Sequence, residues 1–134
     1  MQGMMMNRPL SIISILDYAA EAHPDAGMVS VRTEGDTHRA TYRETYKRVG
    51  QLAHALHALG IEQGDRVATL AWNGHRHFEL YYAISGMGEG CHTINPRLHP
   101  EQIAWIANHA EDKVLIFDKT FLPIVEAIKD HLLT

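Results

Sequence analysis

Apolar residues first recur at helical spacing, over residues 12–22 of the chain. This helix should end at His23-Pro24, because the residue before proline disfavours the helical region. Strand-like residues from Met28 to Val31, the turn signal Glu34-Gly35-Asp36 and a second strand over His38–Tyr42 follow. The pattern predicts an N-terminal helix and then a β-hairpin. The apolar positions of the helix are Ile12, Ile15, Leu16, Ala19 and Ala22.

The next helix has the clearest start signal in the chain. Thr41-Tyr-Arg-Glu44 is a capping-box pattern, in which the threonine hydroxyl and the glutamate carboxylate satisfy free backbone N–H groups. An apolar stripe follows, and Gly60 is a fitting stop at its C-terminal end. The stripe consists of Tyr42, Tyr46, Val49, Leu52, Ala53, Leu56 and Leu59.

The rest of the chain alternates between strands and helices. Arg66–Trp72 is nearly all apolar, which suits a strand buried on both faces of a parallel sheet, and Asn73-Gly74 ends it. The alternation predicts an α/β layered domain with a mainly parallel sheet flanked by helices, as one unit over residues 1–134 without an internal boundary. The later expected elements are a helix around Phe78–Ser85, strand Cys91–Ile94, a helix from Pro100 to Ala110, strand Val114–Phe117 and a last helix over Ile124–Leu132.

Composition narrows the class of protein. The 134 residues are 46% hydrophobic and 21% charged, which is typical of a globular domain, and the net charge of -4 gives no reason to expect nucleic acid as a partner. Cys91 is the only cysteine, so no intrachain disulfide can form and a cytoplasmic location is expected. No stretch approaches the roughly 20 apolar residues of a transmembrane segment.

Three patterns invite a chemical interpretation that their context opposes. Gly86-Met-Gly-Glu-Gly90 has phosphate-loop spacing, but it follows a helix and leads into a strand, the reverse of the order such loops require. His54 and His57 could share a helix face, yet no further ligand stands at a supporting spacing, so we expect no metal site. Cys91 and His92 point to opposite faces of a strand and cannot pair, so no catalytic residue is expected.

Polar residues just past two predicted strands are the candidates for substrate binding. Asn73, Asn95 and Arg97 stand where ligands collect in open α/β sheets. Turn formation by Asn-Gly and Asn-Pro explains the two asparagines equally well. A separate basic group is expected to be a solvated helix face in an acidic protein. It consists of Arg39, Arg43, Lys47 and Arg48.

Longer runs of the sequence resemble the N-terminal part of fatty-acyl-CoA synthetases, which belong to the acyl-adenylate-forming superfamily. Thr41-Tyr-Arg-Glu44 resembles the first core motif of that superfamily, and Gly86–Leu98 resembles the second. The resemblance covers nearly the whole chain, including Met1-Gln-Gly with Arg8-Pro-Leu10. The other runs that carry it are Gly64–Asn73, His75–Tyr82, Glu101–Ile103 and Asn108–Asp112.

This resemblance implies an enzyme that uses ATP and magnesium to convert a fatty or related carboxylic acid to an acyl-adenylate and then passes the acyl group to coenzyme A. In the family, the phosphate loop with its lysine, the adenine-contacting motifs, the magnesium-binding acid and the C-terminal catalytic lysine come later than the motifs present here. We therefore expect the 134 residues to be the N-terminal portion of the large domain, inactive alone and without a bound cofactor.

Two alternatives remain open at this stage. The chain could be a free-standing, non-catalytic module that self-associates, for example as a homodimer, through a sheet edge and apolar faces. It could also belong to a related adenylating enzyme for another acid, such as a methylthio-alkanoate or an aryl acid. The sequence does not choose among acid types.

Overall fold

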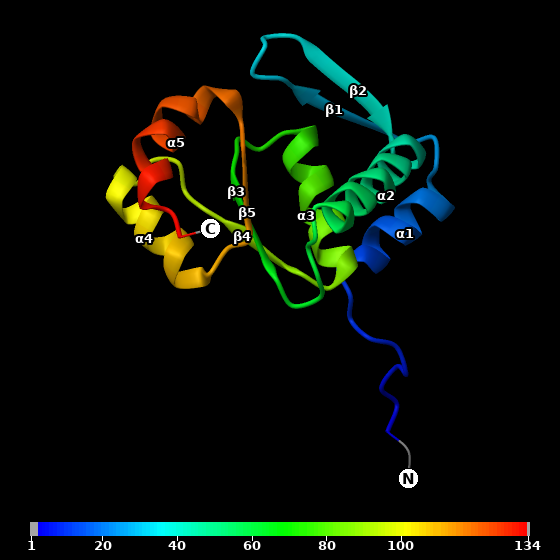
Figure 1. The fold of residues 1–134 in the computed structure, drawn as a ribbon. Helices are drawn as coiled ribbons and strands as arrows, with labels where there is room; N and C mark the ends of the chain where they lie inside the picture. The colour runs from blue at the N-terminus through cyan, green and yellow to red at the C-terminus, as the bar shows by residue number, and fades with distance from the viewer. Residues whose placement is uncertain (1–2, 134) are drawn as a thin grey trace.

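The computed structural model describes residues 3–133, so Met1 and Gln2 of the N-terminal resemblance lie outside the described residues, as does Thr134. Helices and strands follow the alternation expected from the sequence (Figure 1). The helices are α1 (Ile13–Ala22), α2 (Tyr42–Ala58), α3 (His75–Met87), α4 (Pro100–Ala110) and α5 (Leu122–Ile128), with short 3-10 turns at Lys119–Phe121 and Lys129–His131. The strands are β1 (Gly27–Val31), β2 (Thr37–Thr41), β3 (Arg66–Leu70), β4 (Gly90–Thr93) and β5 (Val114–Phe117).

Helices cover both faces of a three-stranded parallel sheet with the order β4-β3-β5. Helices α1, α2 and α3 lie on one side of the sheet and α4 and α5 on the other (Figure 1). The predicted α/β layered fold with a parallel sheet is therefore confirmed. No helix within residues 3–133 combines the length and the apolar character that crossing a membrane requires.

The molecule has a hydrophobic core on each face of the parallel sheet, and strand β3 contributes residues to both. Val67 packs with α1, α2 and α3, whereas Ala68 and Leu70 pack with α4 and α5. All three are fully buried, because successive side chains of a strand point to opposite faces and both faces are covered here. This explains why the β3 sequence is a continuous apolar run without alternation.

The β1–β2 hairpin forms a separate antiparallel sheet at the N-terminal end of α3 (Figure 1). Its strands pair from Gly27 with Thr41 to Val31 with Thr37. One face of the hairpin is more buried than the other and turns toward the helices; Val29 and Val31 lie on the exposed face. The hairpin therefore contacts the rest of the molecule through one face.

The boundaries of several expected elements differ from the observed ones. The capping box at Thr41 and Glu44 is present, and α1 ends before His23-Pro24 as predicted. Strand β3 stops at Leu70 instead of Trp72, because the Trp72 N–H donates to Asp118 Oδ2 at 2.7 Å rather than to a neighbouring strand. Strand β4 covers Gly90–Thr93, one residue earlier than expected.

Parts of the expected apolar stripes are exposed. Ile12, the N-cap residue of α1, and Ile15 within the helix face solvent, and Leu16 is the buried position. In α2, Tyr46 and Leu59 are exposed, because Tyr46 lies at the edge of the helix contact and Leu59 follows the last helical residue. Spacing alone located both helices, but it did not determine how far each was rotated against its neighbours.

Candidate functional site

Three loops meet at one edge of the parallel sheet, where β3, β4 and β5 end. They are residues 71–74, 94–97 and 118–120, and we call them the carboxyl edge. Because the strands are parallel and adjacent, their carboxyl ends lie side by side. Ligands bind at this edge in open α/β sheets, so the loops form the candidate site.

The structure brings together the three residues proposed from the sequence. Asn73, Asn95 and Arg97 all line one depression of about 370 Å³ beside the ends of β3 and β4, which we call the amide depression. Asn95 Oδ1 also accepts a hydrogen bond from the Arg97 backbone N–H at 3.0 Å, a local turn contact. Asn95 therefore shapes the turn and also lines the depression, and its role in substrate binding stays a prediction.

Two aromatic side chains that sequence reasoning did not select also line the amide depression. Trp72 is 43% exposed and Tyr81 is 40% exposed. The Trp72 indole N–H donates to Thr120 Oγ1 at 3.1 Å, and its ring lies 4.9 Å from that of Phe121. The sequence signal for this position was a tryptophan at the end of an apolar run, but we expected Trp72 to continue the strand.

His77 adds a buried imidazole to the lining of the amide depression. Its Nε2 lies 3.0 Å from the hydroxyl of Thr69, a fully buried residue of β3, and its ring centroid lies 4.7 Å from that of Tyr81. Burial lowers the pKa of His77, because removal from water disfavours the charged imidazolium. A neutral His77 can bond Thr69 as donor or acceptor and leaves Arg97 as the cation of this depression.

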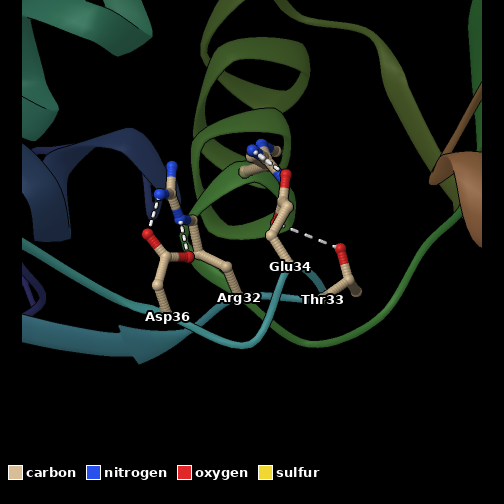
Figure 2. Close-up of polar contacts among 5 residues, drawn as sticks. Arg32, Thr33, Glu34 and Asp36 are labelled. Atoms are coloured by element: carbon tan, nitrogen blue, oxygen red, sulfur yellow. Dashed lines mark hydrogen bonds and ion pairs between the residues drawn. The ribbon is translucent and has the colours of Figure 1, made fainter.

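A second depression, of about 520 Å³, separates the end of β5 from the hairpin turn. Arg76 of α3 donates to both carboxylate oxygens of Glu34 in that turn, at 2.7 and 3.3 Å. This hydrogen bonding holds the pKa of Glu34 at about 2. Figure 2 shows Glu34 reaching from the turn toward the helix, while Arg32 and Asp36 pair across the turn itself. Arg32 and Arg76 thus already have carboxylate partners.

The Cys91-His92 pair and the glycine series make structural contacts. His92 Nδ1 lies 2.7 Å from Asp112 Oδ2, so its polar partner is Asp112 and not Cys91. Burial raises the pKa of the Cys91 thiol, which packs against the core formed with α1, α2 and α3. Gly88 ends α3 with a φ of 94°, a left-handed conformation that favours glycine. The glycine series therefore turns the helix into β4.

The acidic side chains near the carboxyl edge have other partners. In residues 3–133, no three His, Cys, Asp or Glu side chains are grouped to hold a metal ion. The acids nearest the carboxyl edge are already engaged, since Asp118 accepts from the Trp72 N–H and Glu34 pairs with Arg76. The amide depression instead offers amides, aromatic surface and one guanidinium, a set suited to binding an organic anion and without an activated nucleophile.

Comparison with known proteins gives consistent matches. A family model described as AMP-binding enzyme matches residues 16–133. The chain is 52% identical over 132 residues to 3-methylmercaptopropionyl-CoA ligase of Ruegeria lacuscaerulensis, which covers 98% of this chain and 24% of that relative. It is 50% identical over 130 residues to long-chain-fatty-acid–CoA ligase of Thermus thermophilus, and the match covers 97% of this chain and 24% of that relative.

Solved structures give the same picture. The structure of Mycobacterium tuberculosis fatty acyl CoA synthetase matches with a TM-score of 0.79 at 30% sequence identity, over 89% of this chain and 23% of that chain. The chain therefore spans about a quarter of the length of the curated relatives and of the solved structure that it matches.

Proposed function

The chain belongs to the AMP-binding enzyme family, and on that basis we propose that it is the N-terminal portion of an ATP-dependent acid–CoA ligase. In the proposed reaction, the carboxylate of the acid attacks the α-phosphorus of ATP, which forms an acyl-adenylate and releases pyrophosphate. The thiol of coenzyme A then attacks the acyl carbon, which releases AMP. The observation that carries the proposal is the family match over residues 16–133, supported by relatives of about 50% identity that are CoA ligases.

Within such an enzyme, we assign residues 1–134 the role of one structural unit that builds part of the sheet and presents the carboxyl edge. Asn73, Asn95 and Arg97 are the proposed substrate contacts, because they share the amide depression. Amide and guanidinium donors can hold a carboxylate or phosphate, and the half-exposed Trp72 and Tyr81 can cover apolar substrate surface. The ligands of magnesium and of the ATP phosphates are proposed to lie outside these residues.

The acid is proposed to be a fatty acid or a short substituted alkanoate. Two relatives at 52% and 50% identity are named for 3-methylmercaptopropionate and for long-chain fatty acids, so identity over this segment does not separate the two classes. A panel of acids assayed with the complete polypeptide, ATP, magnesium and coenzyme A tests the proposal. Mass spectrometry should detect an acyl-CoA; failure with every alkanoic acid would count against this function.

We also propose that the 134-residue chain alone is inactive and that the protein is located in the cytoplasm. Inactivity is expected because the part of the chain that the structure describes groups no metal ligands, and Arg76, the arginine that lines the second depression, is paired with Glu34. A reducing compartment suits Cys91, the sole cysteine, whose half-buried thiol has no second cysteine with which to pair.

A second candidate function is a non-catalytic module that forms homodimers. Exposed apolar side chains at and within α1 favour it, since the N-cap residue Ile12 and the helix residues Ile15 and Tyr18 are each more than half exposed. The outer edges of β4 and β5 also have no neighbouring strand among residues 3–133. Light scattering on the purified chain distinguishes the cases: a dimer at micromolar concentration supports self-association, and a monomer at high concentration opposes it.

A further inference from the structure

His75 of α3 contacts the middle of the hairpin. Ser30 and His38 are cross-strand partners on the more buried face of the hairpin. Both contact His75, the first residue of α3: Ser30 Oγ accepts the His75 backbone N–H at 3.1 Å, and the His38 ring stacks on the His75 ring with centroids 3.8 Å apart. The middle of the hairpin is therefore held against α3 by an imidazole stack and one hydrogen bond.

The stack is compatible with a neutral His75 imidazole and opposes a charge on that ring. The rings are nearly parallel, at 21°, so two charged rings would repel each other at close range. The Nε2 atom of His38 is buried and meets no hydrogen-bond partner among the described residues. Burial, followed by the proximity of His38, lowers the pKa of His75.

Charged groups around the stack do not reverse this preference. Arg48 of α2 and Arg76 of α3 both disfavour a charge on His75. Glu79 of α3 favours a charge on His75, but its two carboxylate oxygens already accept from Arg48 at 2.6 and 2.9 Å. Glu44 at the start of α2 lies near His38 and is engaged by its capping bond to Thr41. Each nearby carboxylate thus has another partner.

We propose that the β1–β2 hairpin is a proton-sensitive flap, which docks on α3 through the His38–His75 stack and loosens when His75 takes up a proton. Because the docked state resists protonation, its stability is full above the ordinary histidine pKa of about 6.5 and falls as the pH drops below that value. Loosening would open the carboxyl edge, since a small cavity of about 30 Å³ between hairpin and edge is lined by Ser30, Trp72, His75 and Asp118.

The nearby ion pair cannot account for such a response. Glu34 has a pKa of about 2 because Arg76 donates hydrogen bonds to it, so the pair stays charged throughout the range in which histidines titrate. Loss of this pair is therefore expected to loosen the hairpin equally at neutral and mildly acidic pH. The Glu34→Gln variant separates a general weakening of the hairpin from a proton-dependent one.

Hydrogen exchange of residues 27–41 in the 134-residue chain tests the proposal, measured by mass spectrometry from about pH 8 to about pH 5 and corrected for intrinsic exchange rates. In the unsubstituted chain, exchange should rise as the pH falls. In the double variant His38→Gln, His75→Gln it should lose this pH dependence. The control His54→Gln, an exposed histidine of α2, should behave like the unsubstituted chain. Exchange that does not depend on pH in the unsubstituted chain overturns the proposal.

A measurement on the unsubstituted chain does not depend on whether the variants fold. Titration of the His75 ring protons by NMR should give a pKa below the ordinary value of about 6.5, and each unit of lowering predicts about a tenfold increase in the loosened fraction at low pH. A His75 pKa at or above the ordinary value overturns the proposal. So does a double variant that keeps the full pH dependence.

Discussion

Arg48 and Glu79 join α2 to α3 through two hydrogen bonds, from Nε at 2.6 Å and from Nη2 at 2.9 Å. Glu79 is only 5% exposed, whereas about half of the Arg48 side chain is in contact with solvent. Arg48 is therefore the charged partner of a buried carboxylate, at the contact between two helices of the same layer.

Replacement of Arg48 by Gln should destabilise the chain by about 1–2 kcal/mol, less than for a fully buried pair because Arg48 is half exposed. Urea unfolding measures the loss. Arg43→Gln is a matched control on the same helix, since Arg43 pairs with the exposed Asp25 at 3.2 Å, and its effect should stay within about 0.5 kcal/mol. Equal losses for the two variants would contradict the assigned role of Arg48.

The capping box at the start of α2 gives a second stability prediction. Thr41 Oγ1 accepts the Glu44 backbone N–H at 3.2 Å, and the Thr41 N–H donates to the Glu44 carboxylate at 2.8 Å. Thr41→Ala should cost about 1 kcal/mol in thermal or urea unfolding, because it leaves a helix N–H without its acceptor. Thr37→Ala, at an exposed position of β2, is the control. A Thr41 variant as stable as the control would show that the cap does not contribute.

The hairpin turn gives a prediction about acid titration. Glu34 has a pKa of about 2 because Arg76 hydrogen-bonds its carboxylate. Since this value lies below the unfolded one, the pair stabilises the hairpin above about pH 4.5 and loses that contribution as the pH falls through about 2. Carboxylate NMR should detect this titration and, in Arg76→Gln, a return toward 4.5. Titration of Glu34 near 4.5 before substitution would rule out the pair in solution.

The amide depression gives a prediction for the complete enzyme. Arg97→Gln and Asn73→Ala should each lower kcat/KM for the acid by about tenfold, the loss expected for one hydrogen bond to a charged group. Asn95→Asp should lower kcat/KM more than Asn95→Ala, because aspartate keeps the acceptor for the Arg97 N–H but places a negative charge beside the anionic substrate. Arg39→Gln, at an exposed position of β2, is the activity control. Unchanged kinetics in the Arg97 and Asn73 variants would exclude them as substrate contacts.

Local signals predicted much of the fold. The Thr41–Glu44 pattern placed the start of α2, His23-Pro24 placed the end of α1, and the apolar run of β3 predicted a strand covered on both faces. These features depend on residues that are close together in the chain, so they can be predicted from a single sequence.

The contacts that shape the site lie between residues distant in sequence, and the sequence did not predict them. Trp72 leaves the expected strand because Asp118, 46 residues later, accepts its N–H. For Asn73, Asn95 and Arg97, the sequence predicted a position just past the strand ends. The structure shows that the three residues line one depression. The aromatic side chains beside them and the His38–His75 stack require the relative placement of separate elements.

Acid-dependent exchange of labelled pyrophosphate into ATP tests the central claim most directly, because it reports reversible formation of an acyl-adenylate without coenzyme A. The complete polypeptide, supplied with ATP, magnesium and alkanoic acids, should catalyse exchange that requires the acid, and the 134-residue chain under the same conditions should show none above background. Acid-dependent exchange by the 134-residue chain, or its absence from the complete polypeptide with every acid, would contradict the account.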